Sequence, residues 1–194
     1  MRAAKHPLFV AVVALFATSG FGWAQAPQNP PDGFWFKTCQ EEQGSKICTV
    51  QFNVLSPAGK LRATVNLSTL TGKINSKLMR LIVPTGRYIP DGITIQVDQS
   101  RKNKVPYTIC SRSSCFSQIQ MSDELVRVLK RGGKMYLTTT NFQEKKISME
   151  ITLKGFTKSF DGPPLTEAEL REMIELRAIE NANAAKRDNS AASQ

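Results

Sequence analysis

The residues best suited to chemistry in this sequence are its four cysteines, Cys39, Cys48, Cys110 and Cys115. All four follow an N-terminal stretch that resembles an export signal, and an even number of cysteines in an exported chain is typical of structural disulfides. Their positions favour two local bridges, Cys39–Cys48 and Cys110–Cys115, although four cysteines permit three connectivities. Neither spacing is Cys-x-x-Cys, which argues against a redox motif or a zinc site.

Histidine is almost absent. The only one is His6, which lies in the stretch that we expect to be removed on export. The mature chain would then have no Ser–His–Asp or Cys–His pair and no histidine metal ligand. We therefore predict no catalytic residue, no bound metal and no cofactor.

A hydrolase that uses carboxylates alone is a competing hypothesis, because glycosidases need only two acidic groups. Its candidates are four residues of the central region: Asp91, Asp98, Glu144 and Glu150. Asp91 lies in a Pro-Asp-Gly turn, where turn formation explains its type. Nothing in the sequence pairs these carboxylates, so we expect a protein that is not an enzyme.

Basic residues gather in three short clusters. The densest contains Arg101, Lys102 and Lys104 and falls between two predicted strands, where a solvated hairpin turn is the simplest interpretation. The functional alternative is electrostatic contact with anionic lipid headgroups, lipopolysaccharide or an acidic host surface. The clusters Lys130-Arg131 and Lys145-Lys146 occupy similar positions and could extend the same basic surface.

The expected partner is an unidentified protein or an anionic component of the cell envelope. Nucleic acid is not expected, because few aromatic residues are interleaved with the basic clusters. The charge is also uneven along the chain. Residues 25–165 contain 20 Lys and Arg against 10 Asp and Glu, whereas residues 166–194 contain four against six. A basic body is thus joined to a slightly acidic tail.

The N-terminus follows the three-part pattern of a signal peptide. Arg2 and Lys5 precede an uncharged apolar stretch over 8–21, and the small residues Gly22 and Ala24 follow. The apolar stretch is shorter than the roughly 20 residues that span a bilayer. We predict cleavage after Ala24, with an uncleaved anchor or a buried core helix as alternatives. No later segment could span a membrane, so we expect at most peripheral membrane contact and a location in the periplasm, at the outer surface or outside the cell.

Apolar and polar residues alternate through most of residues 34–156, for example in the segments 50–54, 61–68, 93–98 and 147–154. This period of two indicates strands that are buried on one face and wet on the other, as in antiparallel sheets. Further strands are predicted over 35–39, 77–83, 105–110, 115–121 and 134–140. Many short strands separated by Gly and Pro turns predict an all-β fold, a sandwich or a barrel.

Two helices interrupt this pattern. Ser122 can cap a short helix that runs to Leu129 and ends at Gly132, and Thr166 and Glu169 form a capping box. The predicted organisation is a signal peptide (1–24), a disordered Pro-rich linker (25–33), a β-sandwich domain (34–162), a C-terminal helix (163–183) and a disordered tail (184–194).

A set of ordered motifs resembles the invasion-associated locus B family of alphaproteobacteria. The motifs are Trp35 before Cys39, Pro84-x-Gly86-x-x-Ile89-Pro90-x-Gly92, Ile95-x-Val97-Asp98, Cys110-x-x-x-x-Cys115-Phe116 and Leu153-x-Gly155-Phe156. The resemblance covers roughly residues 34–160. It implies an immunoglobulin-like antiparallel β-sandwich exported to the periplasm or the outer surface, with no catalytic motif. Family members in blood-borne pathogens are associated with entry into erythrocytes, whereas many others come from bacteria that invade nothing, so the resemblance leaves a role in host-cell interaction open. The charged extension after Pro164 departs from the family pattern.

We therefore expect a non-enzymatic envelope or secreted protein that binds an anionic or protein partner through a basic surface. The alternative is a periplasmic structural or stress-response factor that acts through its C-terminal helix.

Overall fold

The computed structural model describes residues 33–56 and 59–191; the predicted signal peptide and nearly all of the predicted linker lie outside the described residues. The helices are α1 (Asp123–Arg131), α2 (Phe156–Asp161) and α3 (Glu167–Ala191), with a short 3-10 helix over Ile89–Asp91. The strands are β1 (Phe36–Glu42), β2 (Ser45–Leu55), β3 (Leu61–Thr71), β4 (Ser76–Pro84), β5 (Ile93–Val97), β6 (Asn103–Val105), β7 (Ile109–Cys110), β8 (Ser114–Gln120), β9 (Lys134–Thr140) and β10 (Lys146–Thr152).

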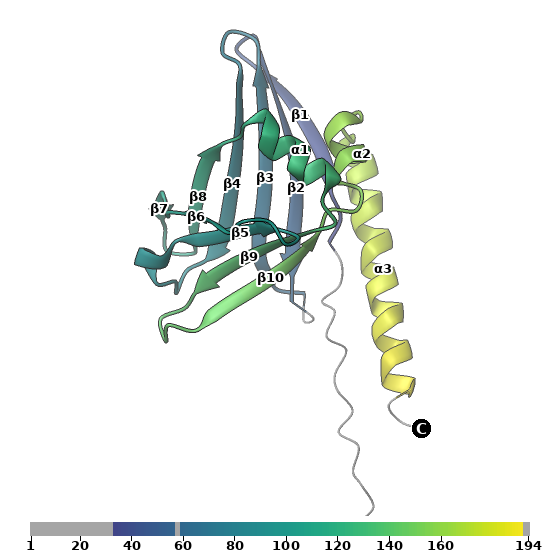
Figure 1. The fold of residues 1–194 in the computed structure, drawn as a ribbon. Coiled ribbons are helices and arrows are strands. Elements are labelled where there is room, and N and C mark those ends of the chain that lie inside the picture. Colours follow the sequence, from purple (N-terminus) through teal and green to yellow (C-terminus); the bar gives the residue numbers. More distant parts are fainter. Residues whose placement is uncertain (1–32, 57–58, 192–194) are drawn as a thin grey trace, which may run out of the picture.

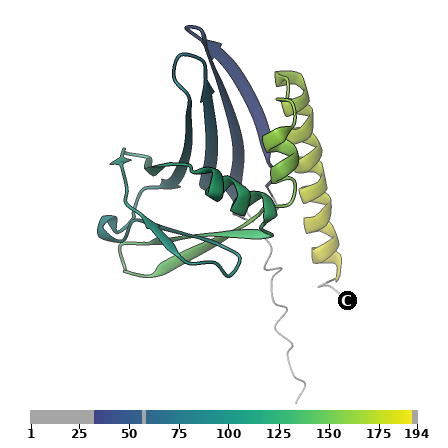
Figure 2. The ribbon, with the colours of Figure 1, turned by 45° about the horizontal axis from the view of Figure 1, so that its top comes forward.

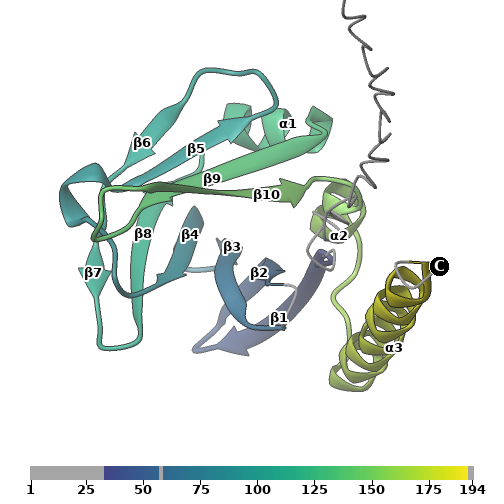
Figure 3. The ribbon, with the colours of Figure 1, turned by 90° about the horizontal axis from the view of Figure 1, so that it is seen from below.

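These strands form two antiparallel sheets that pack face to face (Figures 1 and 3). One sheet has six strands in the order β1-β2-β3-β4-β8-β7, and the other has four in the order β10-β9-β5-β6. The predicted immunoglobulin-like, all-β sandwich is confirmed as the fold class.

Alternation along the strands builds the core between the sheets. In β3, Ala63, Val65 and Leu67 are buried, whereas Asn66 and Ser68 lie on the outward face. Met135 and Leu137 of β9 face them from the smaller sheet and are fully buried. Apolar side chains from both inner faces therefore share one core.

One predicted strand, 105–110, is divided in the structure. β6 ends at Val105 in the four-stranded sheet, and β7 begins at Ile109 in the six-stranded sheet. Pro106 lies between them and has no N–H to donate to a strand ladder. The chain crosses from one sheet to the other at this point.

The predicted short helix is present as α1. The Ser122 hydroxyl accepts a hydrogen bond from the backbone N–H of Leu125, and the helix is followed by Gly132. Val126 and Leu129 are buried on one side. The helix runs to Arg131, two residues beyond Leu129, so Lys130 and Arg131 belong to its last turn rather than to a loop.

The sequence pattern did not predict α2. Gly155, at φ +85°, turns the chain out of the sheet, and the Phe156 side chain then inserts completely into the core. Its ring meets the Trp35 ring edge to face, with centroids 5.0 Å apart. Lys37 Nζ donates to the carbonyls of Phe160 and Gly162 at 2.9 and 3.0 Å. These contacts fasten α2 to the edge strand β1.

The C-terminal helix begins as predicted at the Thr166–Glu169 capping box, but it continues past Asn183 to Ala191. Residues 184–191, which we expected in the tail, thus belong to α3, and the rest of the predicted tail lies outside the described residues. The segment is rich in alanine and has neither Gly nor Pro, which explains its helix propensity. Figure 2 shows α3 beside α2 and the β1 edge, outside the two layers of the sandwich.

Candidate functional site

The four cysteines are paired locally, as expected. Cys39 and Cys48 face each other across β1 and β2, and Cys110 and Cys115 face each other across β7 and β8. Each bridge therefore links two hydrogen-bonded neighbouring strands of the six-stranded sheet. The described residues include no free cysteine. The cysteines have a structural role here.

The four candidate carboxylates of the competing hydrolase hypothesis lie in different local environments. Asp98 accepts hydrogen bonds from the backbone N–H groups of Gly133 and Lys134, and Asp91 accepts one from the Thr140 hydroxyl at 2.6 Å. Glu150 pairs with Lys134 Nζ at 2.6 Å, which raises the pKa of that lysine. Glu144 lies in the turn between β9 and β10 at φ +57°. The contacts of Asp91, Asp98 and Glu150 give these three carboxylates structural roles.

The predicted basic surface is divided between the two ends of the four-stranded sheet. Val97 pairs with Met135, and Asp98 binds the backbone at Gly133, so the turn that carries Arg101 and Lys102 lies at the end where α1 stops. Arg131 is in the last turn of α1 at the same end. We call Arg101, Lys102 and Arg131 the basic end. All three are exposed, and none pairs with a described carboxylate.

The other predicted basic residues lie elsewhere or are occupied. Lys145 and Lys146 lie at the turn between β9 and β10, at the opposite end of the sheet (Figure 1). Lys130 pairs with Asp161 at 2.7 Å and lies over the Phe160 ring, so it joins α1 to α2. Lys104 lies in the edge strand β6. Lysines on an exposed edge strand discourage pairing with another chain, which gives Lys104 a structural explanation.

Arg87 and Tyr107 form a buried polar group that no sequence pattern had indicated. Arg87 is only 8% exposed, and its Nε donates to the Pro84 carbonyl at 3.1 Å. Burial lowers the pKa of Arg87 and raises the pKa of Tyr107, whose hydroxyl has no partner among the described residues. Arg87 belongs to the Pro84–Gly92 motif. That motif therefore contributes a charged side chain to the buried residues of the domain.

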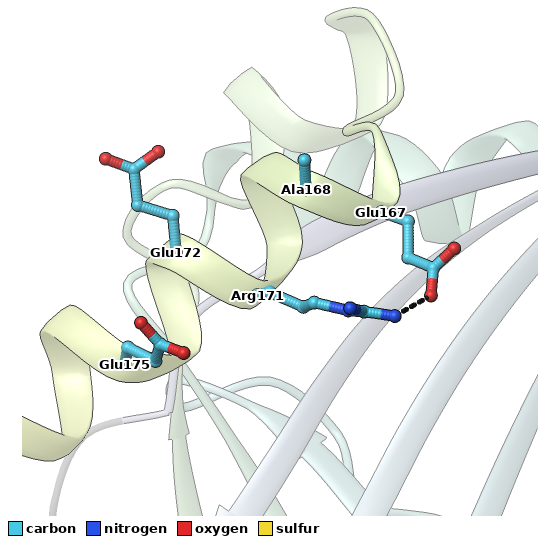
Figure 4. A pocket seen from close by; sticks show the side chains of 5 residues that line it. All are labelled: Glu167, Ala168, Arg171, Glu172 and Glu175. Carbon is cyan, nitrogen blue, oxygen red and sulfur yellow. Dashed lines mark hydrogen bonds and ion pairs between the residues drawn. The ribbon is translucent and has the colours of Figure 1, made fainter.

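A hollow on α3 is lined by residues of that helix alone: Glu167, Ala168, Arg171, Glu172 and Glu175. Figure 4 shows Arg171 reaching back to Glu167, while Glu172 and Glu175 point elsewhere. No second described element lines the hollow, so it is a feature of the helix surface rather than a binding cavity. Within residues 33–191 as described, no cluster of three or more His, Cys, Asp or Glu side chains is placed to hold a metal ion, and no helix is long and apolar enough to cross a membrane.

Two comparisons with known proteins bear on the identity of the chain, whereas no curated protein matches it. A crystal structure of invasion associated protein B from Bartonella henselae is similar, with a TM-score of 0.58 and 19% identity over 67% of this chain and 90% of that chain. At this identity the likeness concerns the fold. The model of the family described as "Invasion associated locus B (IalB) protein" matches residues 35–164. The expected resemblance is thereby confirmed, and the chain belongs to the IalB family.

Proposed function

We propose that this chain is an exported, non-enzymatic protein of the cell envelope that binds an anionic surface through its basic end. The observation that carries this proposal is the set of exposed cations Arg101, Lys102 and Arg131, which have no carboxylate partner among the described residues. The export-type N-terminus and the two disulfides support a location outside the cytoplasm. The Bartonella protein of similar fold is named for invasion, and a host surface is one place where this chain would meet an anionic partner.

The partner chemistry that we propose is a lipid or lipopolysaccharide phosphate. Each Lys or Arg held near an anionic membrane contributes about 1 kcal/mol to binding, and the contribution is screened by salt. The basic end joins a strand turn to the end of a helix, so its cations lie on elements that the core holds in place.

The experiment measures sedimentation with vesicles of phosphatidylcholine that contain phosphatidylglycerol. The double variant Arg101→Gln/Lys102→Gln is expected to weaken binding about tenfold or more, because it removes two cations from the basic end. The matched control is Lys145→Gln/Lys146→Gln, which makes the same change in net charge at the other end of the same sheet. The control should bind nearly as well as the unmodified protein, and binding should fall as salt is added. Equal weakening by both variants, or binding independent of salt, would contradict the proposal.

A second candidate function rests on α3. Ile174, Leu176 and Ile179 are each more than half exposed, which is unusual for large apolar side chains along one helix. These side chains favour a structural factor that contacts a partner protein through α3. Removing residues 166–194 separates the two proposals: vesicle binding through the basic end should survive the deletion, whereas a contact made by α3 should be lost.

A further inference from the structure

The outward face of the six-stranded sheet carries a continuous row of polar side chains. The strand register places Gln51 of β2 beside Asn66 of β3, Asn66 beside Arg80 of β4, and Arg80 beside Gln118 of β8. We call these four residues the amide row. A second row on the same face lies two residues further along each strand and contains Thr49, Ser68, Leu78 and Gln120. The alternation of apolar and polar residues predicts polar side chains on this face. It does not predict that the carboxamides of Gln51, Asn66 and Gln118 lie in the same row as Arg80.

This face is hollowed where the two rows meet. One hollow of about 180 Å³ is lined by Thr49, Asn66, Ser68, Leu78, Arg80 and Gln118. A neighbouring hollow of about 260 Å³ over β1 and β2 is lined by Thr38, Cys39, Gln40, Ile47, Thr49 and Gln51. The two hollows share Thr49, so together they extend across β1, β2, β3, β4 and β8.

Arg80 is held in position before any ligand arrives. Its Nε and Nη2 donate to the amide oxygen of Gln118 at 3.2 and 2.8 Å, and its guanidinium lies 5.0 Å from the centroid of the Phe116 ring. No described carboxylate pairs with it. A cation held in this way loses less conformational entropy on binding an anion than a free side chain would.

Asn66 at the centre of the row is incompletely bonded. Its side-chain oxygen is buried and has no hydrogen-bond partner among the described residues, although such atoms are nearly always paired. Its neighbours in the lining are already engaged, for example the hydroxyls of Thr49 and Ser68 with each other at 2.9 Å. This unpaired oxygen is an acceptor that a hydroxyl group bound in the hollow would satisfy.

We propose that the amide row binds an acidic oligosaccharide, that is, a chain of sugars in which at least one ring carries a carboxylate. Carboxamides and hydroxyls both donate and accept hydrogen bonds, as the hydroxyl groups of a sugar do. Among the described residues, Arg80 is the only charged one that lines either hollow, which favours a negatively charged ligand. Leu78 and Ile47 offer apolar contact to the C–H face of a sugar ring. A peptide that added a strand would need a free sheet edge, whereas the amide row lies on β2, β3, β4 and β8, which are inner strands of the sheet.

This site does not depend on the proposed basic end, because it lies on the other sheet. The experiment titrates the purified protein with tetragalacturonate and, for comparison, with neutral maltotetraose, and it follows both by calorimetry and by the side-chain amide signals of Asn66 and Gln118 in NMR spectra. Saturable binding of tetragalacturonate, with weaker or no binding of maltotetraose and shifts in both amide signals, is expected.

Two variants locate the interaction. Arg80→Gln should weaken tetragalacturonate binding about tenfold, since a charge-assisted bond is lost. Arg112→Gln is the matched control, because Arg112 is exposed in the turn between two strands of the same sheet but lines neither hollow. Thermal unfolding establishes that both variants are folded. The proposal is overturned if no saturable binding occurs, if Arg112→Gln weakens binding as much as Arg80→Gln, or if the backbone amide signals of Arg101 and Lys102 in the same NMR spectra shift instead. The last result would leave the basic end intact as a binding surface.

Discussion

At the scale of single residues, Gly92 shows why the Pro84–Gly92 motif needs its residue types. Its φ is +61°, and a Cβ atom placed on it would lie 2.4 Å from the Val105 carbonyl oxygen. Val105 ends β6, which pairs with β5 directly after Gly92. The glycine therefore lets two neighbouring segments of the smaller sheet approach closely, and any side chain would separate them.

We expect Gly92→Ala to lower the free energy of unfolding by about 3 kcal/mol or more, because backbone strain and a clash with backbone add together. Gly155→Ala is the control. Gly155 also has a positive φ, of +85°, but an added Cβ there would meet no described atom within 4 Å. Its cost should be about 1–2 kcal/mol, from the left-handed conformation alone. Urea unfolding of both variants measures the difference, and equal costs would show that close approach at Gly92 does not matter.

At the scale of elements, the start of α3 depends on one carboxylate. Glu169 accepts hydrogen bonds from the backbone N–H and the hydroxyl of Thr166, both at 2.7 Å, and these bonds lower its pKa. In return, the Thr166 hydroxyl accepts a bond from the N–H of Glu169. This reciprocal pair satisfies N–H groups that the first turn of a helix otherwise leaves free.

A lowered pKa means that the folded helix favours the charged form of Glu169. Its stabilising effect is therefore complete above the ordinary pKa of a glutamate and is lost as pH falls through the lowered value. Thr166→Val removes the hydroxyl but keeps the backbone N–H, so the pKa of Glu169 should rise part of the way back. NMR titration of the Glu169 carboxyl carbon measures both values. An unchanged pKa in the variant would mean that the hydroxyl contributes nothing.

At the scale of the whole molecule, α2 contributes to the core between the two sheets, whereas α3 packs outside it. Phe156 is fully buried between the sheets, and Trp35 Nε1 donates to the Thr152 carbonyl at 2.7 Å, so the chain just before β1 is joined to β10 at this end. By contrast, the described side chains of α3 are mostly exposed. One of its contacts with the body is Arg177 over the Phe34 ring, at 5.9 Å from the centroid.

A chain that ends at Leu165 should therefore remain folded, with a free energy of unfolding within about 1 kcal/mol of the full protein, because few buried contacts are removed. A chain that ends at Lys154 should unfold or become marginal. Losing a buried Phe alone costs about 3–5 kcal/mol, which is comparable to the total stability of many domains. Thermal unfolding followed by circular dichroism compares the two truncations. Unfolding of the first would show that α3 is part of the fold.

The sequence by itself determined the features that depend on local pattern. Alternation in 61–68 and 134–140 predicted strands because a side-chain period of two follows from strand geometry. Ser122 and the Thr166–Glu169 pair marked helix starts because capping is a contact between near neighbours. The nearby cysteines paired locally for the same reason.

Only the tertiary structure decided the features that depend on distant segments. α2 exists because Phe156 packs against residues such as Trp35, far away in sequence. The basic clusters were separated because antiparallel pairing carries Lys145 and Lys146 away from Arg101. The amide row combines four strands, and the sequence contains each of its residues only as an ordinary polar position on a strand. Packing and strand register between distant segments, which no local pattern specifies, are the physical reason in each case.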